Sequence, residues 1–191
     1  MKQLTYPFDE KTIRALNVGE VVSISGKIYT GRDRLHKHLA ETHASPVVLK
    51  DAAIFHCGPV VVKDDNGKWN VVAAGPTTSI REESYSPTVI KEQGIRVIIG
   101  KGGLGAGTLA ACKEFGCVYL QAVGGAAAVI AESIKEVKAV YFLDEFGATE
   151  AMWELEVEDL QATVAMDSHG ESLFANVKAA SLEQLKQLCM V

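Results

Sequence analysis

The sequence predicts an α/β fold in which a β-rich layer is joined to a βαβαβ half built on a parallel sheet. Residues 21–29 alternate polar and apolar side chains, as a half-buried strand does. Residues 59–63 and 68–73 flank the turn Asp64-Asp65-Asn66-Gly67, which is typical of a β-hairpin. From residue 96 onward, short apolar runs alternate with helical segments, and this order gives a parallel sheet with crossover helices.

The predicted strands are short apolar or alternating runs, each bounded by turn residues. Gly26 interrupts the first of them, which indicates a bend or a bulge. Residues 96–99 are mostly apolar and β-branched, which is typical of a strand buried on both faces. In chain order the predicted strands are 21–29, 59–63, 68–73, 96–99, 118–120, 137–143, 154–158 and 162–166.

Helices are predicted where apolar residues recur on one face and where capping residues mark the ends. Asp33 is the candidate N-cap of the first, whose apolar face holds Leu35 and Leu39. Ser86 as N-cap before Pro87 is typical of a helix start, because proline lacks an N–H that would be unpaired there. The predicted helices are 33–43, 86–94, 108–115, 126–134, 148–153 and a C-terminal helix that begins at the capping box Ser181–Gln184.

Composition and charge exclude several classes of protein. With 48% hydrophobic and 23% charged residues and no repeat or linker, the chain predicts one globular domain over residues 1–191. It carries 19 Lys and Arg against 24 Asp and Glu, and no basic stripe favours nucleic acid. No window reaches the roughly 18 apolar residues of a membrane span, and the N-terminus lacks a signal-peptide pattern. We therefore expect a cytoplasmic protein with neither nucleic acid nor membrane as partner.

The four cysteines do not form a metal-binding pattern. Cys112 and Cys117 are five positions apart, and no third cysteine follows at the interval of an iron–sulfur site. We expect reduced thiols that serve as small buried hydrophobic residues, namely Cys57, Cys112, Cys117 and Cys189.

A glycine-rich loop at residues 100–105 formally matches the dinucleotide-binding pattern G-x-G-x-x-G. The next strand ends in Leu120-Gln121-Ala122 without the acidic residue that would bind the ribose, and Lys101 stands too early for a phosphate-binding P-loop. Two interpretations stay open. A small anion could bind the backbone N–H groups of the following helix beside Lys101, or the loop is a tight turn with a solvated lysine.

A second candidate is the segment Gly75–Arg81, in which three hydroxyl residues follow a proline turn. Thr77 and Arg81 lie four residues apart, so a hydroxyl and a guanidinium could converge on one carboxylate. The alternative is a Ser/Thr-rich turn with an exposed arginine. A third candidate is Arg32, which immediately precedes a predicted helix and could point into a site.

The histidines do not identify a catalytic triad. His36 and His38 are two residues apart on a predicted helix, so they are interpreted as solvated rather than as a metal pair. His56 and His169 lie at strand ends or turns without a local partner, and nothing supports a nucleophile at Cys57. The residues alone therefore predict three cationic segments, around Arg32, Arg81 and Lys101, that could bind a small dianion.

Several motifs, in this order and spacing, carry a family resemblance across nearly the whole chain. The sequence resembles the β subunit, or C-terminal domain, of the iron–sulfur class I fumarases and L-tartrate dehydratases. The motifs are Gly31-Arg32-Asp33, Ala53–Pro59, Gly75–Arg81, Gly100–Gly103, Glu145–Trp153 and Asp167–Gly170.

The resemblance implies a swivelling β/β/α fold and a hydro-lyase that adds water reversibly to a C4 dicarboxylate. It also implies a 4Fe-4S cluster held by three cysteines of an α subunit, in an expected α2β2 assembly, so this chain would hold neither a metal nor a cofactor. Fumarate is the expected substrate, with L-tartrate dehydratase as the alternative. A stand-alone dinucleotide- or anion-binding domain is the alternative from a different class.

Matched residue by residue, the resemblance implies that Thr77 is the catalytic base and that Arg32, Arg81 and Lys101 bind the substrate. One departure stands beside this site. The family pattern continues after the arginine with methionine, whereas here Glu82-Glu83 follows Arg81. Two acids at this place could compete for the arginine unless they point outward.

Overall fold

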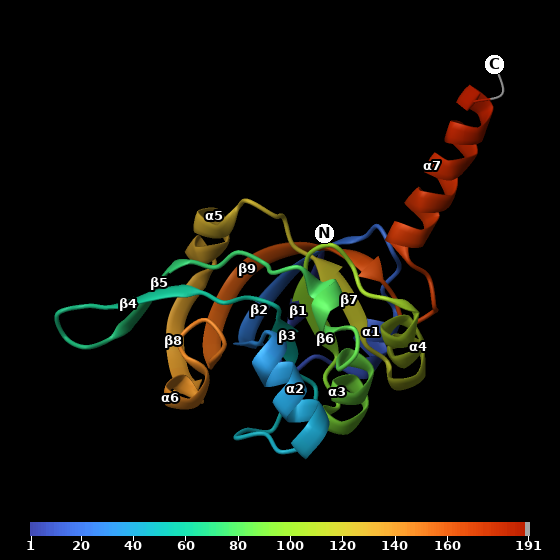
Figure 1. Ribbon diagram of the computed structural model, residues 1–191. Helices are drawn as coiled ribbons and strands as arrows, with labels where there is room; N and C mark the ends of the chain where they lie inside the picture. Colours follow the sequence, from blue (N-terminus) through green and yellow to red (C-terminus); the bar gives the residue numbers. More distant parts are fainter. Residues whose placement is uncertain (190–191) are drawn as a thin grey trace.

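The computed structural model describes residues 1–189 and shows a mixed α/β fold (Figure 1). Within these residues one sheet has seven strands in the order β1-β2-β3-β6-β7-β9-β8, and β2 also pairs with β9. Strands β2, β3, β6, β7 and β9 therefore close into a barrel. The strands are β1 (Lys2–Thr5), β2 (Val21–Thr30), β3 (Ala53–Phe55), β6 (Val97–Gly100), β7 (Val118–Gln121), β8 (Ile134–Tyr141) and β9 (Met152–Met166).

The parallel βαβαβ unit is present but lies one strand earlier than predicted. β3, β6 and β7 are parallel, with α3 (Ser86–Gln93) and α4 (Ala106–Phe115) as the crossovers. The strand expected at 137–143 as the third member is β8, which pairs antiparallel with β9 at the edge of the sheet. The prediction was wrong there because β9 occupies the edge of β7, a pairing between distant segments that local spacing does not encode.

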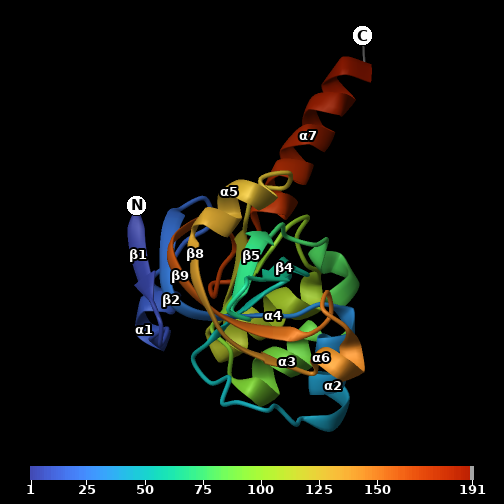
Figure 2. The same cartoon turned by 90° about the vertical axis from the view of Figure 1, so that its left-hand side faces the viewer.

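The other helices are α1 (Glu10–Arg14), α2 (Asp33–Thr42), α5 (Ala127–Glu132), α6 (Leu143–Phe146), α7 (Leu173–Cys189) and the 3-10 turn η1 (Ser79–Glu82). The predicted hairpin is confirmed as β4 (Val60–Lys63) and β5 (Trp69–Ala73). Helices α2, α3 and α4 lie along one side of the barrel (Figures 1 and 2), and α7 stands away from the body in both views.

Several predicted boundaries were wrong. No helix forms at the expected 148–153, where a turn leads into β9 at Met152, and the short helix α6 ends before it at Phe146. The strands expected at 154–158 and 162–166 form the single strand β9. Asp159 has a φ of 56° and bends β9, so the sequence pattern of β9 predicts two shorter strands. The capping box at Ser181–Gln184 falls inside α7, which begins at Leu173.

Two expected caps lie one residue inside their helices. The N-cap of α2 is Arg32 rather than Asp33, whose carboxylate contacts Arg81 instead. The N-cap of α3 is Tyr85 rather than Ser86, whose hydroxyl donates to the carbonyl of Glu82. Both helices still start within one residue of the predicted place.

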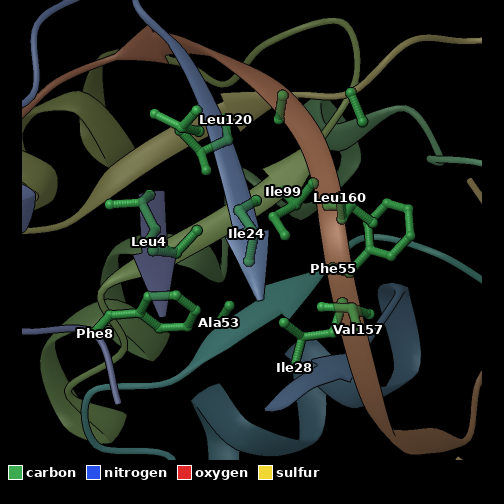
Figure 3. Close-up of a cluster of buried hydrophobic side chains, with 14 of the residues drawn as sticks. Leu4, Phe8, Ile24, Ile28, Ala53, Phe55, Ile99, Leu120, Val157 and Leu160 are labelled. Atoms are coloured by element: carbon green, nitrogen blue, oxygen red, sulfur yellow. The ribbon is translucent and has the colours of Figure 1, made fainter. Parts of the chain in front are cut away.

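Apolar side chains, most of them from the strands, form the barrel cluster (Figure 3). A second apolar cluster lies between the outer face of the sheet and helices α2, α3 and α4, and it includes Cys112 and Cys117. Cys57 is buried as expected, but Cys189 is exposed, because α7 projects from the body and has no buried residue. The labelled members of the barrel cluster are Leu4, Phe8, Ile24, Ile28, Ala53, Phe55, Ile99, Leu120, Val157 and Leu160.

Among the helices of residues 1–189, none has the length and apolar character needed to cross a membrane. The predicted single domain extends over residues 1–191, of which Met190 and Val191 lie outside the described part.

Candidate active site

Two of the candidate residues follow the carboxyl ends of parallel strands, a position where ligands commonly bind in α/β proteins. Arg32 follows β2, and Lys101 follows β6. The segment that carries Thr77 lies between them, because the Thr77 N–H donates to the His56 carbonyl at 2.6 Å and the Ser79 N–H donates to the Lys101 carbonyl at 2.9 Å. The fold thus gathers three loops that are separate in sequence.

Thr77 and Arg81 are in direct contact. Arg81 lies in η1, just after Thr77, and its Nη2 donates to the Thr77 Oγ1 at 3.0 Å. A guanidinium that donates to a hydroxyl oxygen favours negative charge on that oxygen, as a catalytic base requires. The same Nη2 lies 3.0 Å from the Asp33 Oδ2, and both of these side chains are well exposed. Arg81 therefore joins the threonine to the first turn of α2.

Arg32 lies deeper in the structure. Its Nε is 3.4 Å from the Glu150 Oε1 and, in residues 1–189, is a buried polar atom without a hydrogen-bond partner. The side chain passes over Gly58, where an added Cβ would lie 2.9 Å from the Arg32 Nη1. Burial raises the pKa of the neighbouring Cys57 thiol to about 12, against the opposing effect of Arg32, so Cys57 is not poised as a nucleophile.

Lys101 is half-buried at the end of β6. Its side chain passes Gly124, where an added Cβ would lie 3.5 Å from the Lys101 Cδ. Among the described residues no carboxylate lies within 4 Å of its ammonium. Lys101 therefore carries a charge that is available to an anionic ligand, whereas Arg32 and Arg81 each have an acidic neighbour.

The glycine loop does not offer an open anion site at the start of α4. Glu83 fills that position: its Oε2 accepts from the Gly105 N–H at 2.6 Å, and its Oε1 accepts from the Thr108 N–H at 3.1 Å. The Thr108 hydroxyl donates to the same carboxylate at 2.6 Å. The interpretation in which an external anion binds these N–H groups is corrected, because a carboxylate of the chain already satisfies them.

Glu82 does not point outward, and it does not pair with Arg81. Its side chain is fully buried, and neither carboxyl oxygen has a hydrogen-bond partner within residues 1–189. Burial and the nearby charge of Asp33 raise the pKa of Glu82 to about 7, against the opposing effects of Arg81 and Arg32.

Sequence reasoning missed a buried polar cluster beneath the site. His36 was expected to be solvated but is fully buried, and its ring meets that of His56 edge to face at 4.6 Å. His56 in turn contacts Ser79 at 2.9 Å. A signal was available for His36, because it lies three residues before Leu39 on the buried face of α2. His169 is exposed, and within the described residues no group of three His, Cys, Asp or Glu side chains forms a possible metal site.

Comparison with known proteins agrees with this arrangement of motifs. The family model for the fumarase C-terminus matches residues 3–177. A Geobacillus stearothermophilus protein provisionally named fumarate hydratase class I is 55% identical over 96% of this chain, which spans 35% of that protein. A Methanocaldococcus jannaschii protein provisionally named L(+)-tartrate dehydratase subunit beta is 42% identical over 97% of this chain and 98% of its own length. The L(+)-tartrate dehydratase subunit beta of Escherichia coli is 34% identical over 96% of this chain and 91% of its own length. The chain belongs to the fumarase C-terminus family.

Proposed function

We propose that this chain is the β subunit of a class I fumarate hydratase, which hydrates fumarate reversibly to L-malate. The observation that carries the proposal is the contact between Thr77 and Arg81, on a segment whose Ser79 N–H donates to the carbonyl of Lys101. A C4 dicarboxylate has two negative charges, and cations from separate loops would bind them. The proposal includes a swivelling domain over residues 1–191, a cytoplasmic location and an α2β2 assembly.

In this proposal Arg32, Arg81 and Lys101 bind and orient the substrate carboxylates. In the dehydration direction Thr77 takes a proton from the carbon next to a carboxylate and holds it on Oγ1; in hydration it returns that proton. Arg81 would favour the deprotonated threonine through the hydrogen bond to that oxygen. The cations also stabilise the negative charge that builds up on the substrate in the transition state.

The 4Fe-4S cluster belongs to the α subunit in this proposal. Residues 1–189 contain no suitable group of ligands, and Cys57, Cys112 and Cys117 are all buried in this chain. The cysteine ligands of the cluster would come from the partner α subunit.

L-tartrate dehydratase is the second candidate, because two of the relatives are named as β subunits of that enzyme. Identity favours fumarate, at 55% against 42% and 34%. The stand-alone anion-binding domain is less favoured, because Glu83 occupies the N–H groups of the glycine loop.

The test is an anaerobic purification of the tagged chain from its native host, followed by assays of the eluate with fumarate and with L-tartrate. A larger iron–sulfur partner with fumarate hydration supports the proposal. Turnover of tartrate alone would replace it with the second candidate. Recovery of the chain alone and free of iron would contradict both.

The cationic loops can be tested in the same complex. Lys101→Met and Arg81→Met should each weaken a competitive dicarboxylate inhibitor by about 1.5–3 kcal/mol, the range of a charged hydrogen bond. Lys91→Met removes an exposed lysine on α3 and serves as the control, with unchanged inhibition expected. Unchanged inhibition in both site variants would mean that these cations face solvent.

A further inference from the structure

We propose that His56 and Ser79 are positioning residues, as the central links of a buried hydrogen-bond chain that holds the loops of Arg32, Thr77 and Lys101 in register. The chain runs between the glycine loop and the start of α2. It consists of the Gly103 N–H, Tyr119, Ser79, His56, His36 and the Arg32 carbonyl. The link to catalysis rests on the proposed function, whereas the link to loop geometry does not.

The contacts are continuous and buried. The Gly103 nitrogen is 3.3 Å from the Tyr119 hydroxyl, which is 3.0 Å from the Ser79 Oγ. Ser79 is 2.9 Å from the His56 Nδ1, and the two histidines meet through their Nε2 atoms at 3.1 Å. The His36 Nδ1 is 3.0 Å from the Arg32 carbonyl oxygen. All four side chains are fully buried.

The direction of every hydrogen bond follows from its neighbour. The His36 Nδ1 faces a carbonyl, which only accepts, so this nitrogen carries the proton. Burial lowers the pKa of His36 to about 4 and lowers that of His56 well below its usual value, so both rings are neutral. The unprotonated His36 Nε2 then accepts from the His56 Nε2–H, and the His56 Nδ1 accepts from the Ser79 hydroxyl. Ser79 accepts from Tyr119, and Tyr119 accepts from the Gly103 N–H.

Each donor therefore points the same way, from Gly103 toward Arg32. The two ends cannot exchange roles, because a carbonyl has no proton to give and a backbone N–H has no free lone pair. This hydrogen-bond chain therefore cannot transfer a proton from one end to the other. Its role is to fix geometry, and a buried polar network with every member satisfied rigidifies its surroundings.

The links touch each candidate loop. The Arg32 carbonyl is the last acceptor, the His56 carbonyl accepts from the Thr77 N–H, and the Ser79 N–H donates to the Lys101 carbonyl. Packing supports the same conclusion at Gly100. A Cβ added there would lie 1.9 Å from the Ser79 Oγ, 3.1 Å from the Tyr119 hydroxyl and 3.2 Å from the His56 Nδ1. The backbone before Lys101 thus packs directly against three links.

The test uses Ser79→Ala in the full chain, alone and assembled with its partner subunit. Loss of the hydroxyl leaves the His56 Nδ1 without a donor and Tyr119 without an acceptor. Ser168→Ala is the matched control, since Ser168 is also buried and its hydroxyl has no partner within residues 1–189. Tyr119→Phe breaks the chain at another link and serves as the second variant if Ser79→Ala does not fold.

The first readout is amide hydrogen exchange of peptides covering 75–82 and 100–104, which needs no activity. We expect exchange to rise by about tenfold or more in Ser79→Ala or Tyr119→Phe and to be unchanged in Ser168→Ala. Unchanged exchange in both Ser79→Ala and Tyr119→Phe would overturn the inference, regardless of the activity of the complex.

The second readout is kinetic. In an active complex kcat should fall by about tenfold or more while KM rises by less than about threefold. Proton transfer by Thr77 needs close placement, whereas the long side chains of Arg32 and Lys101 still reach the carboxylates when their loops loosen. The kcat of the double variant Ser79→Ala/Tyr119→Phe should be no lower than that of the worse single variant, because both substitutions break the same hydrogen-bond chain. Increased exchange with unchanged kcat would overturn the catalytic link. An inactive wild-type complex would instead contradict the proposed function.

Discussion

The inside of the barrel and the layer beneath the candidate site are both buried, yet they contain different kinds of side chain. Apolar side chains such as Ile24, Phe55 and Leu160 fill the barrel (Figure 3). Across the sheet, the site rests on buried polar side chains, among them His56, Ser79 and Glu82. Shape alone matters in the barrel, whereas each polar group beneath the site needs a specific partner. The fold thus places much of its stability in one region and its chemical specificity in the other.

The largest effect should come from the rim of the site, with little effect on folding. Thr77→Ala removes the proposed base and should lower kcat of the assembled enzyme by about 10²- to 10⁴-fold, the usual contribution of a general base. The hydroxyl is only half-buried, so the melting temperature should barely change. Thr78→Ala is the matched control, because Thr78 is an exposed neighbour of the same type. Wild-type kcat in Thr77→Ala would remove this residue from the role of base.

The barrel should show the reverse pattern. Leu160→Ala deletes a side chain that is 2% exposed, so the free energy of unfolding should fall by about 2–5 kcal/mol as a cavity forms. kcat per folded molecule should be unchanged, because Leu160 belongs to the barrel cluster, which contains none of the candidate site residues. Leu188→Ala, on the exposed face of α7, provides the comparison and should have little effect. Denaturant unfolding measures both. A loss of kcat in fully folded Leu160→Ala would show that barrel packing and activity cannot be separated.

Glu82 is the exception within the polar layer, because its carboxyl oxygens have no hydrogen-bond partner in residues 1–189. The pH dependence of stability tests this difference. The pKa of Glu82 is about 7 in the folded chain against an ordinary 4.5, so the unfolded chain loses this proton first as pH rises. Wild-type stability should therefore fall between pH 4.5 and about 7, with a full cost of about 3 kcal/mol above that range.

Glu82→Gln keeps the shape and removes the titration. The stability of this variant relative to wild type should increase by about 2 kcal/mol from pH 5 to pH 8. Glu114→Gln, at an exposed glutamate of α4, should show no such trend. If the Glu82→Gln difference is flat with pH, the carboxyl is paired in solution and obeys the same rule as its polar neighbours.

These two regions also differ in what could be predicted from sequence. Barrel strands β2, β6 and β7 and helices α2, α3 and α4 were expected close to their observed places, because local spacing and capping encode them. Strand β3 was not predicted, and β9 was expected as two strands. The loops bearing Thr77, Arg81 and Lys101 were singled out for the same reason, and the structure brings Thr77 and Arg81 into contact. Their catalytic and binding roles are still predictions.

The polar layer could not be predicted, because its contacts join distant segments. His36 meets His56 from 20 residues away, and Tyr119 meets Ser79 from 40 residues away. Such pairs exist only once the parallel strands have placed their carboxyl ends side by side. Glu83 was missed for a related reason, since the N–H groups that it caps lie 22 and 25 residues further on.

The smallest effect should be at Asp33, where the polar layer reaches solvent. Its ion pair with Arg81 joins side chains that are 40% and 45% exposed, so Asp33→Asn should change the free energy of unfolding by less than about 1 kcal/mol.

The effect of Asp33→Asn on binding should be clearer, because Asp33 competes with a dianion for the Arg81 guanidinium. A dicarboxylate inhibitor should bind a few-fold more tightly to Asp33→Asn, most clearly at low salt, where the lost charge is least screened. Glu41→Gln removes another exposed ion pair of α2, with Lys37, and should leave inhibition unchanged. A stability loss above about 2 kcal/mol would instead show that the Asp33–Arg81 pair stabilises the fold as a buried ion pair does, so the polar layer would extend to the surface of the site.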